Sequence, residues 1–76
     1  MANDLVLLLQ RRFNLTEAEA SVTLAIGEGR RLADIANGRG VSVHTVRNQL
    51  KSAFVTTHCR RQSEIVLLVQ SLRQNP

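Results

Sequence analysis

Polar side chains recur at helical spacing between Val41 and Phe54, and their types suit the recognition of nucleic acid. The polar positions on this stretch are His44, Arg47, Asn48, Lys51 and Ser52. Residues three and four apart share one face of a helix, and Arg47 lies on the flank of that face. In the major groove of DNA, Arg and Lys donate to guanine, Asn pairs with adenine, and all of them hold phosphate. The face is therefore typical of a groove-reading helix; the alternative is an ordinary solvated helix face.

A helix has to carry these side chains, and the residues between them predict one. Ser42 is a good N-cap, because its hydroxyl accepts a hydrogen bond from an amide of the first turn. Apolar residues then fall at steps of three and four and form one stripe. They are Val43, Val46, Leu50, Ala53 and Phe54. We expect an amphipathic helix that begins after Ser42, ends before a break near His58-Cys59, and turns its polar face outward.

Positive charge is concentrated in the second half of the chain, although the net charge is only +4. Residues 1–38 carry four basic and five acidic side chains, whereas residues 39–76 carry six basic side chains against Glu64 alone. A positive field around the polar helix is the pattern of a nucleic-acid binder; a solubilising basic surface is the alternative. The chain has no Trp or Tyr. Both Phe residues fit the core, so binding of single strands by base stacking is poorly supported.

Length and cysteine usage limit the class of protein. A chain of 76 residues allows one domain with one modest core. The single cysteine allows no internal disulfide, which favours a reducing compartment. No apolar run is long enough to span a bilayer, and the LVLLL run near the N-terminus lacks the basic region and cleavage site of a signal peptide. We expect a soluble, cytoplasmic protein that is not in a membrane.

Helix signals recur along the whole chain, which shows neither alternating strand patterns nor internal repeats. The expected helices, with their caps, run from Asn3 or Asp4 to Phe13, from Thr16 to Ile26 or Gly27, from Leu32 to Asn37, from Ser42 to a break near His58-Cys59, and from Gln62 or Ser63 to Arg73. Thr16 and Glu19 have the form of a capping box. The second helix is expected to bury Ala18, Val22, Ala25 and Ile26, and Gly27 and Gly29 stop it. The fold class is therefore all-α, a four- to five-helix bundle.

A short helix, a glycine turn and a longer basic helix together make a helix-turn-helix unit. Gly38-Arg39-Gly40 supplies the turn, in which we expect at least one glycine in the left-handed conformation. The small side chains of Ala33 and Ala36 let the two helices cross closely. In such a unit the first helix braces across the DNA backbone while the second lies in the major groove.

From Leu15 to Leu72 the sequence resembles the LuxR-type (GerE-like) helix-turn-helix domain of bacterial transcription regulators. The matching residues hold their spacing without gaps: LTEAEA at 15–20, Gly29, Ile35-Ala36, Gly40-Val41-Ser42, Thr45-Val46-Arg47, Leu50, Phe54 and RRQSEIV at 60–66. The resemblance implies a wingless four-helix domain that binds double-stranded DNA and usually dimerises, often through its last helix. Such domains typically form the C-terminal output of a longer regulator. We divide the chain accordingly into an N-terminal helix at 1–14, a candidate linker stub to a sensor domain, and the DNA-binding domain at 15–73.

The resemblance also implies a set of DNA contacts around this helix. The expected base or groove contacts are Arg47, Asn48, Lys51 and His44; the expected phosphate contacts are Thr45, Ser42, Arg30, Arg31, Arg60 and Arg61. The start of the brace helix is a natural seat for phosphate, to which Arg30-Arg31 adds charge. Arg60-Arg61 follows the groove helix and either reaches the DNA backbone or is solvated. We interpret Arg11-Arg12 as a solvated helix face.

Three positions depart from the family pattern. Arg31 stands where a serine often caps the brace helix, Gly38-Arg39 replaces a bulkier pair, and His58-Cys59 replaces Gly-Val. The last change puts a non-glycine residue at an expected left-handed cap. These departures bear on stability and local geometry more than on function.

The last helix is apolar around most of its circumference. Its expected core stripe is Ile65, Leu68, Val69 and Leu72. Val66 and Leu67 then lie about 100° and 200° around the helix from Ile65, on the side expected to face water. Self-association through Val66 and Leu67, which would give a homodimer, is the economical explanation. Docking onto a partner domain is the alternative.

Other functions find less support in the sequence. Cys59 and the two histidines lack a fourth ligand and a workable zinc spacing, so we expect Cys59 as a small buried side chain, with no metal and no cofactor. We expect no enzyme, because so short a chain has no room for a catalytic pocket and no acid is placed to orient a histidine. Region 4 of a sigma factor has a similar helix-turn-helix pattern but requires a polymerase-binding region that these residues lack. The alternative from another class is a protein-interaction module that grips a protein partner with the basic face and the apolar last helix.

Overall fold

The described residues of the chain form five α helices and no strand. The computed structural model describes residues 2–74, and the side chains from residue 4 onward. The helices are α1 (Ala2–Phe13), α2 (Glu17–Gly27), α3 (Leu32–Arg39), α4 (Val43–Thr57) and α5 (Gln62–Gln74). The predicted all-α fold is confirmed. No helix in this part of the chain combines the length and the apolar character needed to cross a bilayer.

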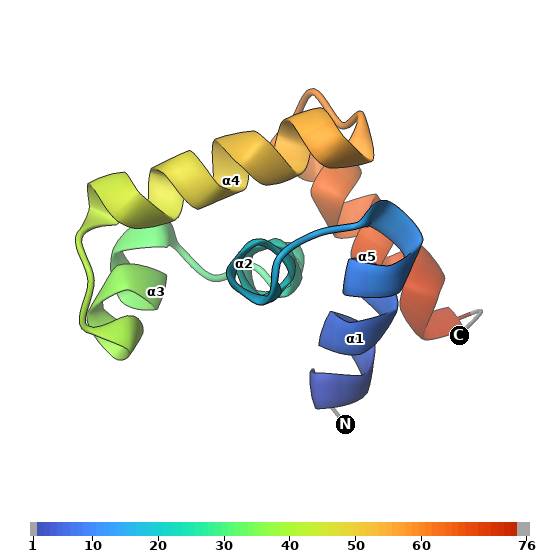
Figure 1. Ribbon diagram of the computed structural model, residues 1–76, viewed down its shortest axis with the longest axis horizontal. Helices are drawn as coiled ribbons and strands as arrows, with labels where there is room; N and C mark the ends of the chain where they lie inside the picture. Colours follow the sequence, from blue (N-terminus) through green and yellow to red (C-terminus); the bar gives the residue numbers. More distant parts are fainter. Residues whose placement is uncertain (1, 75–76) are drawn as a thin grey trace.

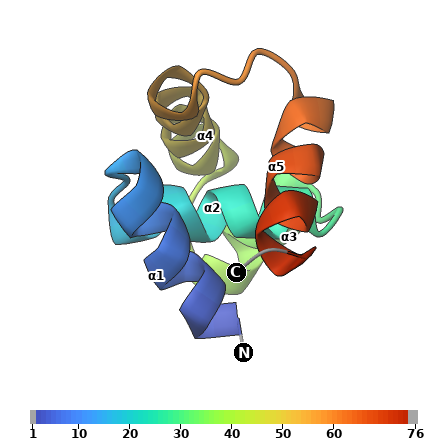
Figure 2. The ribbon, with the colours of Figure 1, turned by 90° about the vertical axis from the view of Figure 1, so that its right-hand side faces the viewer.

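The second helix is the centre of the molecule. Figure 1 looks along α2, and the other four helices surround it and contact it. Figure 2 shows α1 and α5 on opposite sides of α2, with α4 above them. Burial follows this arrangement, because Ala20, Val22, Thr23, Leu24 and Ile26 are all buried. Burial was predicted for Val22 and Ile26 and is confirmed there, but Ala18 and Ala25 are only half-buried. A helix with neighbours on several sides has no single buried stripe.

Local signals place the start and the end of α2. The predicted capping box is confirmed: the Glu19 amide donates to Oγ1 of Thr16 at 3.1 Å, and the Thr16 amide donates to Oε1 of Glu19 at 2.9 Å. Gly27 is the last helical residue, and the chain then turns through Gly29 with φ +89°. The turn requires glycine at Gly29, because a side chain at that φ is strained.

Two clusters of buried side chains share α2 between them. The first cluster consists of Leu9, Leu15, Ala20, Leu24, Ala53, Val69 and Leu72. The second consists of Val22, Ile26, Ile35, Ala36, Val46, Leu50 and Ile65. Leu9 of α1 is fully buried in the first cluster, so α1 packs into the same core as the helices that follow it.

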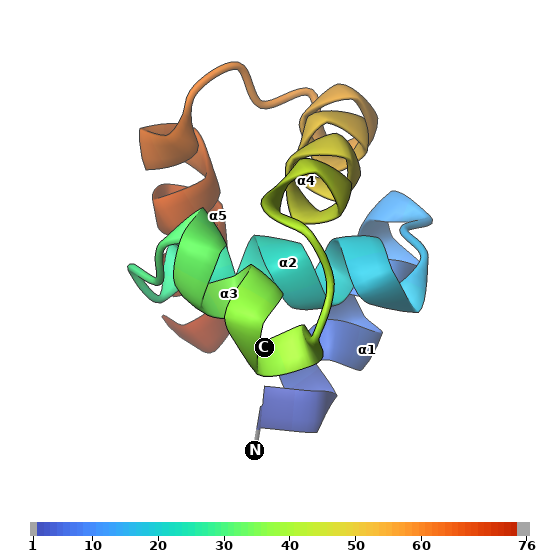
Figure 3. The same cartoon turned by 90° about the vertical axis from the view of Figure 1, so that its left-hand side faces the viewer.

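The connection from α3 to α4 differs from its prediction in detail (Figure 3). Helix α3 runs to Arg39, so Gly38 belongs to the helix and the turn is Gly40-Val41-Ser42. Gly40 has φ +69°, which confirms a left-handed glycine. Ala36 is buried as expected for a close crossing, whereas Ala33 is exposed and does not contribute to it.

The remaining helix ends show which caps were predicted correctly. Ser42 caps α4, because its Oγ accepts from the Thr45 amide at 3.1 Å, and His58 takes the predicted left-handed conformation, with φ +61°. The caps predicted for the first and last helices are wrong. Helix α1 includes Ala2, so Asp4 lies in its first turn, and the side chain of Asn3 lies outside the described residues. Helix α5 begins at Gln62, and its start is satisfied by Glu64, as described below.

Candidate nucleic-acid interface

Helix α4 lies across one side of the molecule with its outer face open (Figure 1). Its inner face is closed, because Val46, Leu50, Ala53 and Thr57 are buried. The predicted groove residues are on the other side: His44, Arg47, Asn48 and Lys51 are all exposed. No acidic residue occurs anywhere in α4. The helix therefore presents donors and positive charge to solvent over several turns.

The N-terminus of α4 offers hydrogen-bond donors beside this face. Ser42 and Thr45 are exposed, and their hydroxyl oxygens lie 3.0 Å apart. The helix dipole gives the first turn a partial positive charge, which favours an anion there. These two predicted phosphate residues therefore lie together at one end of the exposed face.

Contacts with α3 fix the direction in which α4 points. The Arg39 guanidinium donates to Oε1 of Gln49 at 3.2 Å, from the end of α3 to the middle of α4. The Val41 amide donates to the carbonyl of Ala36 at 3.1 Å and closes the turn. Arg39 belongs to the pair that departs from the family pattern, and its bond to Gln49 joins the two helices at this turn.

A second contact ties α4 to the start of α2. Ser52 was assigned to the solvated polar face, and it is exposed, but its hydroxyl lies close enough to the Glu19 carboxylate to stabilise the charged form. The Ser52 hydroxyl, together with the Thr16 amide, holds the pKa of Glu19 below its usual range, against the smaller opposing effect of burial. Ser52 therefore links α4 to the capping box of the central helix.

Val55 is a residue of this face that the sequence interpretation missed. Its side chain is 76% exposed, the most of the exposed large apolar residues that the structure describes. Val55 stands seven residues after Asn48, so the two share one side of the helix. The signal was present in that spacing, which places an apolar side chain outside the buried stripe.

The other predicted phosphate residues lie at the ends of neighbouring helices. Arg30 and Arg31 are exposed just before α3, where Arg31 occupies the N-cap position without capping through its side chain. Arg60 and Arg61 are exposed between α4 and α5, and both of their amides donate to Oε1 of Glu64, at 3.1 and 3.2 Å. Both arginine side chains therefore project from a fixed backbone.

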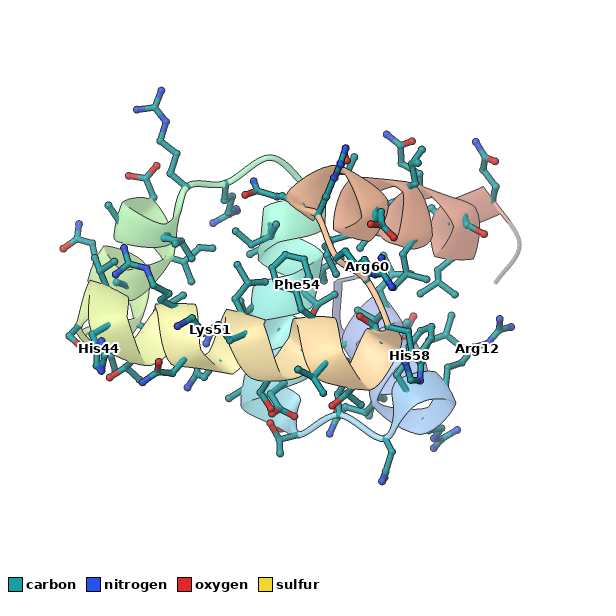
Figure 4. The ribbon with its side chains drawn as sticks, turned by 90° about the horizontal axis from the view of Figure 1, so that it is seen from above. Arg12, His44, Lys51, Phe54, His58 and Arg60 are labelled. Carbon is teal, nitrogen blue, oxygen red and sulfur yellow. The ribbon has the colours of Figure 1, made fainter. Side chains whose placement is uncertain are left out.

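Figure 4 looks onto the outer face of α4 and shows how the basic side chains follow it. His44 and Lys51 lie along the helix, and His58 marks its end. Arg60 lies on the neighbouring loop, and Arg12 lies beyond the C-terminal end of α4 in this view. Arg12 was assigned to a solvated helix face, and it is exposed. Exposed basic side chains therefore also occur outside the helix that carries the predicted groove contacts.

The predicted dimer residues differ from each other in exposure. Leu67 is 65% exposed, whereas Val66 is half-buried. In the predicted core stripe of α5, Ile65, Val69 and Leu72 are buried and Leu68 is half-buried against the first cluster. Leu7 of α1 is a further exposed leucine, at 50%. Among the residues on α5, Leu67 is therefore the apolar side chain most available to a partner.

The cysteine and histidines do not gather into a metal site. Cys59 is half-buried rather than fully buried as predicted, and it packs against the second cluster. Within the described part of the chain, no group of three or more His, Cys, Asp and Glu side chains is arranged to hold a metal ion.

No family model, curated protein or solved structure matches this chain. What the chain does therefore has to be inferred from its own residues and their arrangement.

Proposed function

We propose that this chain binds double-stranded DNA sequence-specifically, as a bacterial cytoplasmic transcription regulator or its C-terminal output domain. One observation carries the proposal. The outer face of α4 exposes His44, Arg47, Asn48 and Lys51 and has no acidic residue. A helix of this kind fits the major groove, where Arg and Lys pair with guanine and Asn pairs with adenine.

In this proposal, α3, the turn Gly40-Val41-Ser42 and α4 act as a helix-turn-helix of the LuxR type. Helix α3 braces the unit across the backbone, and α4 enters the groove. Two features support the assignment. The left-handed Gly40 allows the sharp turn, and the bond from Arg39 to Gln49 sets the angle between the helices.

Phosphate contacts would hold α4 in register on the duplex. Ser42 and Thr45 would bind a phosphate at the positive end of α4, and the exposed pairs Arg30-Arg31 and Arg60-Arg61 would bind the strands on either side. Contacts of this kind supply affinity and orientation without reading sequence. Sequence would be read by Asn48, Arg47 and Lys51, and by Val55, whose methyl groups suit the C5-methyl of thymine.

A homodimer through α5 would place two copies of α4 on one site. The exposure of Leu67 supports this pairing, with the half-buried Val66 beside it. A two-fold axis would separate the two groove helices by about one DNA turn, ~34 Å, and would select an inverted repeat. A sensor domain joined before α1 would supply the regulatory signal.

Binding titrations with duplex DNA test the proposal directly. Sites are first selected from a random duplex library, and fluorescence anisotropy then measures affinity over a range of salt concentrations. If each subunit neutralises on the order of four phosphates, the slope of log K against log salt is about −3.5 per subunit.

A pair of arginine variants locates the binding face. Arg47→Ala should weaken binding strongly, whereas Arg11→Ala removes the same charge from the end of α1 and should have a small effect. A flat salt response, or no binding at roughly 50 mM salt, contradicts the proposal and favours a protein-interaction module, which the exposed Leu7 and Leu67 would also suit.

A further inference from the structure

Two of the proposed groove residues hydrogen-bond to each other. Nδ2 of Asn48 lies 3.2 Å from Nε2 of His44, and both side chains are exposed. The residues are four apart, so they are neighbours on the outer face of α4. The bond lies on the surface where bases would be read. Which of the two nitrogens donates therefore decides which groups Asn48 has left for a base.

The chemistry of the two nitrogens determines that direction. Nδ2 of an asparagine carries two hydrogens and cannot accept, so Nε2 of His44 has to be the acceptor. His44 is then in the tautomer that carries its proton on Nδ1. The bond uses one of the two hydrogens on Nδ2. The second hydrogen and Oδ1 remain for another partner.

The remaining edge of Asn48 matches adenine. In the major groove adenine presents N7 as an acceptor and its N6 amino group as a donor, and an asparagine amide pairs with both. An amide rotated by half a turn would present its donor to a donor and its acceptor to an acceptor. Whatever fixes the rotation of the Asn48 amide therefore fixes which base it fits.

We propose that His44 is a positioning residue that holds the Asn48 amide in the adenine-reading orientation before DNA binds. The inference rests on the proposed function. Ordering an exposed side chain on binding costs free energy, and a side chain that is already ordered avoids that cost. His44 thus contributes to specificity through Asn48, without itself having to contact a base.

Two substitutions at position 44 separate this role from simple charge or shape. His44→Gln keeps an acceptor, the side-chain oxygen, at a similar reach. His44→Lys keeps a long polar side chain and adds positive charge, but an ammonium cannot accept a hydrogen bond. Both residues favour helix, and position 44 is exposed, so circular dichroism should show an unchanged fold.

Base discrimination is the main readout. The position at which Asn48→Ala loses its sequence preference identifies the base pair that Asn48 reads. That pair is then changed from A·T to G·C in the selected duplex. Wild type should prefer A·T by roughly 5- to 150-fold, the range of one bidentate base contact. His44→Gln should keep this preference. His44→Lys should reduce it by about 2- to 12-fold, while raising the affinity for both duplexes through its added charge.

The double variant His44→Lys with Asn48→Ala tests whether His44 acts through Asn48. The lysine should not change discrimination once the asparagine is gone. An equal change in both backgrounds would mean that His44 reads a base itself, and no change in either would mean that the pairing is irrelevant to recognition. Both outcomes overturn the inference.

A measurement without DNA keeps this inference separable from the proposed function. In the free protein, nitrogen NMR of His44 should show the proton on Nδ1, and Asn48→Ala should shift the Nε2 resonance. A proton on Nε2 at neutral pH overturns the inference whatever the protein binds. If the NMR agrees but wild type binds no duplex, the proposed function fails and the reading role of the pair fails with it.

Discussion

Gly27 and Val69 pack so closely that only glycine fits at the end of α2. A Cβ atom at Gly27 would lie 2.7 Å from the Cβ of Val69 and closer still to its Cγ2. Val69 is buried, at 1% exposure, so it has little room to move aside. The contact sets how near α5 can come to the central helix, and it therefore affects the whole core.

We expect Gly27→Ala to lower the free energy of unfolding by about 1–3 kcal/mol, the usual cost of overpacking a core. Gly38→Ala is the matched control, because a Cβ there meets nothing within 4 Å. Gly38 lies inside α3 without a positive φ, so alanine should stabilise the protein by about 0.4–1 kcal/mol. Urea denaturation of both variants measures the difference. Equal effects would show that α5 moves away from α2 at little cost.

Gly27 also shows why some of the fold was predictable and some was not. Its position at the end of a helix is a local property, and the sequence indicated it correctly, as it did the caps at Thr16 and Ser42. Its contact with Val69 joins two helices that are far apart in the sequence, and no local pattern contains it. The buried residues predicted for α2 were partly wrong for the same reason, because burial on α2 depends on four neighbouring helices.

The candidate site follows the same division. The exposure of Arg47, Asn48 and Lys51 was predicted from periodicity, because one face of α4 is apolar and the opposite face has to be wet. The contact of Ser52 with Glu19 and the bond from Arg39 to Gln49 were not predicted, because each needs the three-dimensional arrangement. The cap of α5 was missed although it is a local feature. Glu64 lies inside the helix and accepts the amides of the two residues before the helix, whereas the cap had been assigned to Gln62 or Ser63.

The lowered pKa of Glu19 makes stability depend on pH. The Ser52 hydroxyl is the largest cause, followed by the Thr16 amide. Because the pKa is lower in the folded state, the contribution is complete above the unfolded-state pKa and is lost as the pH falls through the folded-state pKa. Stability should therefore fall as the pH drops below the ordinary pKa of a glutamate, about 4.3. Glu19→Gln should flatten this decline, and Ser52→Ala should flatten it less.

Thermal unfolding of wild type and both variants at several pH values provides the check. Glutamine still accepts backbone amides in a capping box, so the helix should persist in Glu19→Gln. A decline as steep in that variant as in wild type would assign the acid sensitivity to other carboxylates.

His58 carries strain that glycine would relieve. Its φ of +61° lies in the left-handed region, which costs most residues roughly 1–2 kcal/mol. We expect His58→Gly to raise the free energy of unfolding by about 1 kcal/mol, because the strain is relieved. Glycine also makes the unfolded chain more flexible, and this entropy reduces the gain. Asn14→Gly is the control, because Asn14 has φ +57° but asparagine tolerates this region better. A larger gain at Asn14 than at His58 would refute the strain argument.

Asn48 and Arg61 should affect DNA binding in different ways. Both are exposed, but Asn48 lies on the face of α4 that we propose to enter the groove, where one base contact gives about 1–3 kcal/mol of discrimination. Arg61 would contact only phosphate, which carries no sequence information. Asn48→Ala should relax the preferred sequence at particular positions, while Arg61→Ala should weaken all sites alike and make the salt slope less negative by about 0.9. Site selection with each variant tests this. Uniform losses from both would place a different face in the groove.

Leu67 should matter for assembly on DNA and not for the fold of the single chain. Its side chain is 65% exposed on a helix already held by Ile65, Val69 and Leu72. Leu67→Asp should therefore change the free energy of unfolding by no more than about 0.5 kcal/mol. It should abolish cooperative occupancy of a duplex with two half-sites, because a charge buried without a partner disfavours an apolar contact.

Leu7→Asp is the matched control on α1, where the leucine is 50% exposed. A one-helix contact is small, so the free protein is expected to dimerise weakly and to pair mainly on DNA. Gel-shift titrations with one and two half-sites separate affinity from cooperativity. If Leu67→Asp unfolds the domain, Leu67 belongs to the core after all. If Leu7→Asp alone removes cooperativity, the two-fold contact lies on α1, and the distance between the two copies of α4 has to be derived from that pairing instead.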